Sequence, residues 1–228
     1  MNPHENHRKR MRRRYIKQGF ESFADHEVLE FLLFYCYPRR DTNEIAHRMI
    51  KEFGSLHNLL ESDVATIMKK LNCTENIAVF LNMLPKAANR YFRNKWGEGA
   101  ILDNEKTAGE YTIDLFVGHT VEMFYVLCLD KKFRIINAVM ISEGTVDESA
   151  VYPREIVGAA IQNNAAYIIL THNHPGGTLR PSRGDLEVTR RVVDGLQFLN
   201  LTVVDHIIVA GDTYYSFAAR KQLVNGYV

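Results

Sequence analysis

The sequence contains little cysteine and no long hydrophobic run, and each absence excludes a class of protein. The three cysteines (Cys36, Cys73 and Cys128) are an odd number and show no CxxC or CxxxC spacing. They argue against a disulfide framework and a cysteine-based zinc site, and they favour a reducing compartment. No apolar run approaches the roughly 18–20 residues of a membrane-spanning helix, and the N-terminus lacks the apolar core of a signal peptide. We therefore expect a cytoplasmic protein without a membrane partner.

A strong overall charge is also lacking, because the net charge is +1, but basic residues are concentrated near one end. Residues 8–17 carry seven basic side chains and no acid. Such a block attracts nucleic-acid phosphates, so DNA is a candidate partner of residues 1–20, the basic arm. Its candidate contacts are Arg8, Lys9, Arg10, Arg12, Arg13 and Arg14. The alternative is a solvated, poorly ordered arm that touches nothing specific.

The remaining chain reads as two domains. Hydrophobic residues make up 46% of the 228, which is ordinary for a globular protein and enough for one large or two small domains. Residues 21–94 carry apolar side chains at three- and four-residue spacing and predict an all-helical domain. Residues 94–104 contain two glycines and no periodicity, and predict a linker.

Residues 105–228 contain both strand-like and helix-like segments, and this pattern predicts a mixed sheet with helices packed on it. A helix around 105–117 precedes two strand-like segments, VEMFYVLCLD and FRIINAVMI, which predict a hairpin. Pro153 is well placed to open a helix that runs to about residue 164. AYIILT then predicts a buried strand, PSRGDLEVTRRVVDGLQFL a helix, and TVVDHIIVAG and TYYSF the closing strands.

The segment from Thr171 to Asp185 carries the chemistry. His172 and His174 follow an apolar strand, where residues i and i+2 project to the same face. Asp185 lies in the first turn of the next helix, where it can face back toward them. Two histidines and one carboxylate leave a fourth position for water, as in catalytic zinc sites, and zinc lowers the pKa of water from about 15.7 to about 7. We therefore predict one Zn²⁺ ion bound by these three residues. Alternatively, Ser182 caps the helix and Asp185 complements its dipole.

HxH followed by seven residues and SxxD resembles the JAMM signature of the JAB/MPN metalloprotease fold. The longer string HNHPGG…PSRGD…TRR, with DHIIVAG and then Ser-Phe, is similar to the RadC family, strongly over 105–228. The resemblance implies an α/β fold, with an N-terminal helical domain followed by a JAB/MPN mixed-sheet domain layered like cytidine deaminase.

The same resemblance implies a glutamate at the start of the first strand, a place that Glu122 occupies. The resemblance implies that Glu122 is the general base and that Ser182 donates a hydrogen bond to the developing oxyanion. Glu143 and Glu155 are competing candidates for the base, and sequence alone does not rank the three by geometry. His206 lies in a strand and is expected to be a hydrogen-bonded structural histidine rather than a ligand.

The resemblance is weaker over residues 8–93, where RadC proteins resemble a helix-hairpin-helix module that offers backbone N–H groups to DNA phosphates. Here the hairpin reads LNCTENIA, without the two glycines of the family pattern and with an acidic residue at the turn. The helix-hairpin-helix is therefore degenerate, and close approach of a phosphate is not supported by glycine.

These patterns favour a RadC-like zinc metallopeptidase that acts on a peptide or isopeptide bond of an unknown protein or peptide, with a link to DNA repair or mobile DNA. The alternative is a non-enzymatic DNA-associated or protein-interaction module with a structural metal. A nucleobase deaminase is excluded, because it needs the motifs HxE and PCxxC. This chain has His174 instead of a glutamate two residues after His172, and it has no paired cysteines.

Overall fold

The computed structural model describes residues 3–97, 99–144, 152–196, 199 and 201–223. The chain forms two compact units, Met1–Lys86 and Ala87–Val228. The division falls inside helix α6 (Glu75–Trp96), beside the internal Pro85, and not in the expected linker at 94–104. The second half of α6 belongs to the sheet unit because the Asn89 amide donates to the carbonyls of Asp114 and Leu115.

The helical unit confirms the helices expected over residues 21–94. Their bounds are α2 (Asp25–Leu33), α3 (Asn43–Phe53), α4 (Leu56–Glu61), α5 (Val64–Leu71) and the first half of α6. Apolar residues at helical spacing meet in one core, which includes Leu29, Leu33, Met49, Leu59, Ile67 and Leu81. No helix in the described residues is long and apolar enough to cross a membrane.

The turn between α5 and α6 forms without the glycines whose absence the sequence shows. Asn72 follows α5 in the left-handed conformation, with φ of 46°. Asparagine is one of the few residues other than glycine that visits this region routinely, because its short side chain bonds locally. The sequence therefore keeps a tight turn at this position by substituting asparagine.

The basic arm is a helix, α1 (Pro3–Gln18), and not a poorly ordered segment. Met11 packs with Phe31 and Phe34, so α1 shares a small core with α2. Arg8 is buried, and its guanidinium donates to the carbonyls that follow α2, those of Phe34, Tyr37, Pro38 and Arg40. The reading of residues 1–20 as a solvated arm without specific contacts is therefore wrong, because a buried guanidinium that satisfies carbonyls fixes the helix in place.

A second arginine of α1 also bonds within the helical unit. Arg14 forms a bidentate pair with Glu27, at 2.7 and 2.8 Å, and its guanidinium lies over the Phe23 ring. The hydrogen bond from Arg14, followed by that from the Ala24 N–H, lowers the pKa of Glu27 to about 2. Other basic side chains of the arm, Lys9, Arg10, Arg12 and Arg13, are exposed.

The sheet unit contains the expected helices and strands in the expected order. They are α7 (Glu105–Phe116), β1 (Met123–Leu129), β2 (Ile135–Glu143), α8 (Pro153–Gln162), β3 (Tyr167–Asn173), α9 (Arg183–Leu196), β4 (Thr202–Ala210) and β5 (Thr213–Ser216). The strand order is β2-β1-β3-β4-β5, and β3 and β4 are parallel while the other neighbours are antiparallel. The sheet is therefore mixed, as predicted, and the fold is α/β.

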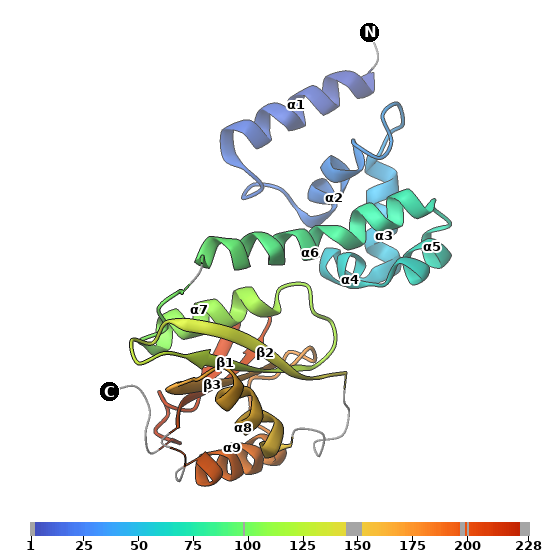
Figure 1. Ribbon diagram of the computed structural model, residues 1–228. Helices are drawn as coiled ribbons and strands as arrows, with labels where there is room; N and C mark the ends of the chain where they lie inside the picture. The colour runs from blue at the N-terminus through green and yellow to red at the C-terminus, as the bar shows by residue number, and fades with distance from the viewer. Residues whose placement is uncertain (1–2, 98, 145–151, 197–198, 200, 224–228) are drawn as a thin grey trace. The chain divides into compact units, whose positions relative to one another are not determined.

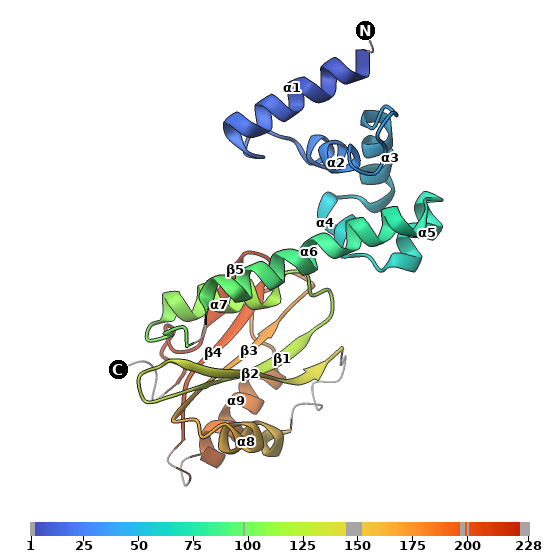
Figure 2. The same cartoon turned by 45° about the horizontal axis from the view of Figure 1, so that its top comes forward.

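Helices cover both faces of this sheet (Figures 1 and 2). One core packs α7 against the sheet through residues that include Ala108, Leu115, Leu127, Ile169 and Ile207. The other packs α8 and α9 against the opposite face through Val126, Ile156, Leu170, Val192 and Leu196 among others. Because α9 connects the parallel strands β3 and β4, its first turn lies in the chain directly after the loop that leaves β3.

Gly109 allows α7 to approach β5 closely. A Cβ at this position would lie 2.3 Å from Cζ of Tyr214. We expect Gly109→Ala to lower the free energy of unfolding by about 1–3 kcal/mol, because the ring or the helix must shift. The matched control is Gly158→Ala in α8, where a Cβ meets nothing within 4 Å and should stabilise the helix by up to about 1 kcal/mol. Urea unfolding of both variants measures the difference, and equal shifts would contradict the packing argument.

Candidate metal centre

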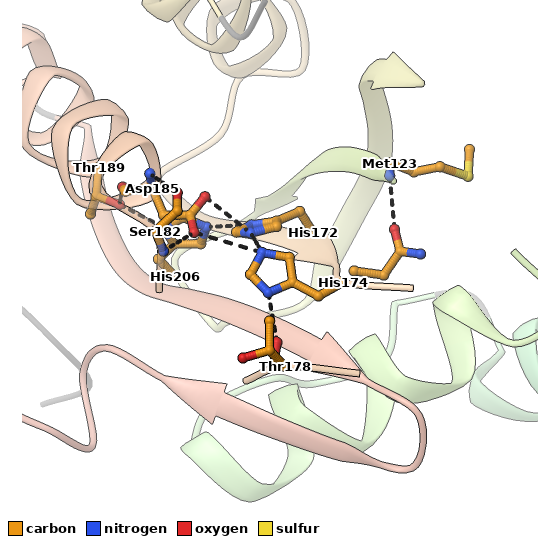
Figure 3. A network of polar contacts seen from close by, with 9 residues as sticks. Met123, His172, His174, Thr178, Ser182, Asp185, Thr189 and His206 are labelled. Atoms are coloured by element: carbon orange, nitrogen blue, oxygen red, sulfur yellow. Dashed lines mark hydrogen bonds and ion pairs between the residues drawn. The ribbon is translucent and has the colours of Figure 1, made fainter. Parts of the chain in front are cut away.

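The structure brings His172, His174 and Asp185 together at the carboxyl end of β3 (Figure 3). The Nε2 atoms of the two histidines are 2.9 Å apart. Asp185 reaches them from the first turn of α9, with Oδ1 3.2 Å from Nε2 of His172 and Oδ2 3.7 Å from Nε2 of His174. The strand alternation and the helix start predicted from the sequence thus place three potential ligand groups around one point.

These separations fit a tetrahedral cation. Ligand atoms about 2.0–2.1 Å from a tetrahedral zinc ion lie about 3.3 Å from one another, which falls among the distances above. The orientation of His174 also fits, because its Nδ1 lies 2.7 Å from the carbonyl oxygen of Thr178. A carbonyl only accepts, so Nδ1 of His174 carries the hydrogen and the Nε2 lone pair faces the other two residues. Two histidines and one carboxylate leave one tetrahedral position for water or substrate.

Asp185 serves the helix and the site at once. Its Oδ2 accepts a hydrogen bond from the Ser182 N–H at 2.7 Å, and its own N–H donates to Oγ of Ser182 at 3.1 Å. This is a reciprocal capping box, so the capping alternative raised by the sequence is correct and does not exclude a ligand role. The bond to Oγ uses a lone pair of the hydroxyl and not its hydrogen, which can serve another acceptor.

The charges of the site favour an ionised Asp185. Burial acts to raise its pKa, but the neighbouring His172 and the Ser182 N–H outweigh burial. The pKa of this carboxyl therefore lies below its usual value.

Glu122 lies directly before β1, is exposed, and approaches the two histidines. One of its carboxylate oxygens is within 4.8 Å of ligand nitrogens of both His172 and His174. Within the described part of the chain, neither Glu143 nor Glu155 belongs to such a group. The geometry thus separates three glutamates that the sequence did not rank, and it favours Glu122 as the acid beside the site.

Asn173 is a residue that the sequence reasoning missed. It lies between the two histidines in the sequence, and its side chain is buried. Its Oδ1 accepts from the Met123 N–H at 2.8 Å, and its Nδ2 donates to the Val121 carbonyl at 2.9 Å. These two backbone groups flank Glu122, so the amide fixes the segment that carries the glutamate. The available signal was its place in the HxH motif, where strand alternation turns it away from the ligands.

His206 is a buried, hydrogen-bonded residue of β4, as expected from the sequence. Its Nε2 lies 2.9 Å from Nδ1 of His172, whereas Asp185 Oδ1 faces the other ring nitrogen of His172, Nε2. The preceding residue, Asp205, is also buried and holds the end of β5 and the residues after it, because its carboxylate accepts from the Ser216 hydroxyl at 2.6 Å and the Ala218 N–H at 2.9 Å.

Burial raises the pKa of Asp205 to about 6, although the hydrogen bonds from Ser216, Ala218 and His206 oppose the shift. The native state therefore binds this proton more tightly than the unfolded chain, whose aspartates titrate near about 4. Stability from this group is full below about pH 4 and is lost as pH rises through about 6, by up to about 3 kcal/mol. Urea unfolding of metal-free Asp205→Asn and of the unsubstituted protein over this range should show that the substitution removes this slope. Parallel pH profiles would contradict it.

The comparisons with known proteins agree with this architecture. The family model described as RadC-like JAB domain matches residues 102–223. A UPF0758 protein of Fusobacterium nucleatum is 33% identical over an alignment of 218 residues, which covers 92% of this chain and 94% of the relative. A UPF0758 protein of Pseudoalteromonas translucida is 33% identical over 211 residues, with 92% and 94% covered. The chain belongs to the RadC-like JAB domain family.

Proposed function

We propose that this chain is a zinc-dependent hydrolase that cleaves a peptide or isopeptide bond. The observation that carries the proposal is the convergence of His172, His174 and Asp185, with the Glu122 carboxylate alongside. A structural zinc site is closed by four protein ligands, whereas these three leave a position for water. The arrangement therefore supports hydrolysis over a purely structural metal.

The protein groups have separate tasks in this proposal. Zinc, when bound, supplies a nucleophilic water at neutral pH and polarises the scissile carbonyl. Glu122 accepts the proton that the attacking water loses and passes it to the leaving amine. The hydroxyl hydrogen of Ser182 donates to the oxygen on which negative charge develops. The chemistry follows from the site, while the partner protein or peptide does not.

Metal analysis and cleavage assays on the full chain test the proposal together. Protein purified without chelator should hold about one zinc ion per chain, and His172→Ala should lose it, because one of three ligands is gone. The control is His57→Ala, which removes an exposed histidine of the helical unit. The unsubstituted protein should release new amines from peptide and isopeptide libraries. This cleavage should stop when a chelator is added and recover when zinc is restored. Pure protein that binds no zinc would refute the proposal.

We propose DNA contact by α1 as a second activity, carried by the exposed side chains of Lys9, Arg10, Arg12 and Arg13. Arg8 and Arg14 are left out because they already bond within the helical unit. Changing the four exposed residues to glutamine should weaken duplex binding and flatten its salt dependence, by about 0.9 in the log–log slope for each phosphate that is no longer neutralised. Changing Arg190 and Arg191 of α9 to glutamine is the control. If the salt dependence of duplex binding is the same in the α1 variant as in the unsubstituted protein, the proposal that α1 contacts DNA is refuted.

A further inference from the structure

His172 is the end of a continuous hydrogen-bonded chain that starts at the main chain of Asp185 (Figure 3). Oγ1 of Thr189 lies 2.5 Å from the Asp185 carbonyl oxygen and 2.6 Å from Nδ1 of His206. Nε2 of His206 lies 2.9 Å from Nδ1 of His172. Thr189 and His206 are both buried, and neither is one of the three proposed ligands or the proposed base.

The direction of every hydrogen in this chain follows from its first acceptor. The Asp185 carbonyl can only accept, so the Thr189 hydroxyl spends its one hydrogen on it. Oγ1 of Thr189 must then accept from Nδ1 of His206, which places the ring hydrogen of His206 on Nδ1. A neutral imidazole has one ring hydrogen, so Nε2 of His206 is an acceptor. Nδ1 of His172 must therefore donate to it.

The surroundings of His206 keep it neutral and hold its ring. His206 is completely buried, and its two ring nitrogens bond to an imidazole and a hydroxyl rather than to a carboxylate, so it carries one ring hydrogen. Its ring stacks on Phe217, with centroids 4.7 Å apart and planes 20° apart, and meets the edge of Phe124. The rotation that would exchange its two nitrogens is therefore blocked by packing.

We propose that Thr189 and His206 are positioning residues that fix the tautomer of His172, so that its Nε2 lone pair faces the metal position. The role as a zinc ligand rests on the function proposed above, whereas the tautomer is a property of the metal-free protein. The two ligand histidines thus reach the same state by different routes. His174 donates from Nδ1 directly to a carbonyl, and His172 does so through a second imidazole and a hydroxyl.

This arrangement couples two ligands through α9. Asp185 presents its carboxylate to the site, and its carbonyl sets the hydrogen that orients His172. Loss of the Thr189 hydroxyl would free Nδ1 of His206 from its acceptor, and His206 could then carry its hydrogen on Nε2. His172 would have to accept on Nδ1 and carry its own hydrogen on Nε2, where it blocks a metal ion.

The experiment combines ¹⁵N spectroscopy of histidine with zinc affinity. In metal-free, unsubstituted protein above the pH range of histidine titration, the ring hydrogen should reside on Nδ1 of both His172 and His206. Thr189→Val should shift both rings toward Nε2–H and weaken zinc binding by about 10–100-fold, the range typical of outer partners of a ligand. Thr189→Ser, which restores a hydroxyl, should recover both the tautomers and most of the affinity.

The outcomes separate this proposal from that of zinc hydrolysis. We call the hydrogen-bonded chain from the Asp185 carbonyl through Thr189 and His206 to His172 the relay. If Nδ1 of His206 carries no hydrogen in the unsubstituted protein, the relay is overturned even if zinc binds and peptides are cleaved. Absence of zinc binding overturns the hydrolase, while the ring hydrogens of the metal-free protein still report on the relay. Unchanged zinc affinity and tautomers in a folded Thr189→Val variant also overturn the relay. Should that variant not fold, the spectra of the unsubstituted protein and of Thr189→Ser decide.

Discussion

Asp185→Asn should weaken zinc binding by at least about 100-fold and abolish zinc-dependent hydrolysis. Outer partners of metal ligands are already worth about 10–100-fold, and this substitution removes the one anionic ligand of the proposed set. The amide oxygen of asparagine can still accept from the Ser182 N–H, so the capping box that begins α9 is largely kept. The expected loss therefore reports on the metal and not on the helix.

Competition with a zinc chelator measures this effect, and circular dichroism checks that α9 and the sheet remain folded. The matched control is Ser182→Ala, which removes the Oγ that accepts from the Asp185 N–H but keeps the carboxylate. It should cost about 1 kcal/mol of stability, as expected for a lost cap, and change zinc affinity far less than Asp185→Asn does. Zinc affinity in Asp185→Asn equal to that of the unsubstituted protein would exclude this carboxylate as a ligand.

Glu122→Gln should reduce the turnover number by about 10²–10⁴-fold while zinc remains bound. A glutamine side chain has nearly the same shape, but it does not accept and return a proton, and that is the size of a general acid–base contribution. The metal should stay because His172, His174 and Asp185 are unaltered, and because Glu122 is exposed beside them. The zinc content and the pH profile of hydrolysis should both be recorded.

Glu143→Gln is the control for this prediction. Glu143 pairs in the sheet with Met123, the residue that follows Glu122, and is likewise exposed. Its substitution should leave turnover within a few-fold of the original, because its carboxylate is not grouped with the histidines in the described residues. Full activity in Glu122→Gln, or a similar loss in both variants, would remove Glu122 from the role of base.

Local patterns were enough to predict the elements of the sheet unit and the meeting of its candidate ligands. Alternation in β3 and the cap-like start of α9 lie within one stretch of chain, so the spacing of His172, His174 and Asp185 already limits their geometry. Glu122 is predicted only by the family resemblance, because it directly precedes a different strand, β1, and only the pairing of β1 with β3 brings it near the histidines.

Tertiary contacts decided what the sequence did not show. The pairing of β3 with β4 places His206 opposite Leu170 and hence behind His172, and no local pattern encodes that register. Arg8 looked like part of a phosphate-binding block, but the carbonyls beyond α2 claim it. Contacts also divide the chain inside α6, because Asn89 ties the second half of this helix to α7.

The segment that carries the proposed ligands has a consequence for how the protein would exchange a bound zinc ion. His172 and Asp185 are only 13 residues apart (185 − 172), and each is already held by the scaffold, by β3 pairing and by the capping box. Closing so short a loop costs little conformational entropy, so little folding free energy depends on the ion. Zinc fingers, by contrast, unfold when stripped. We expect this preorganised domain to stay folded when stripped and to regain activity on resupply, so that zinc availability acts as a reversible switch.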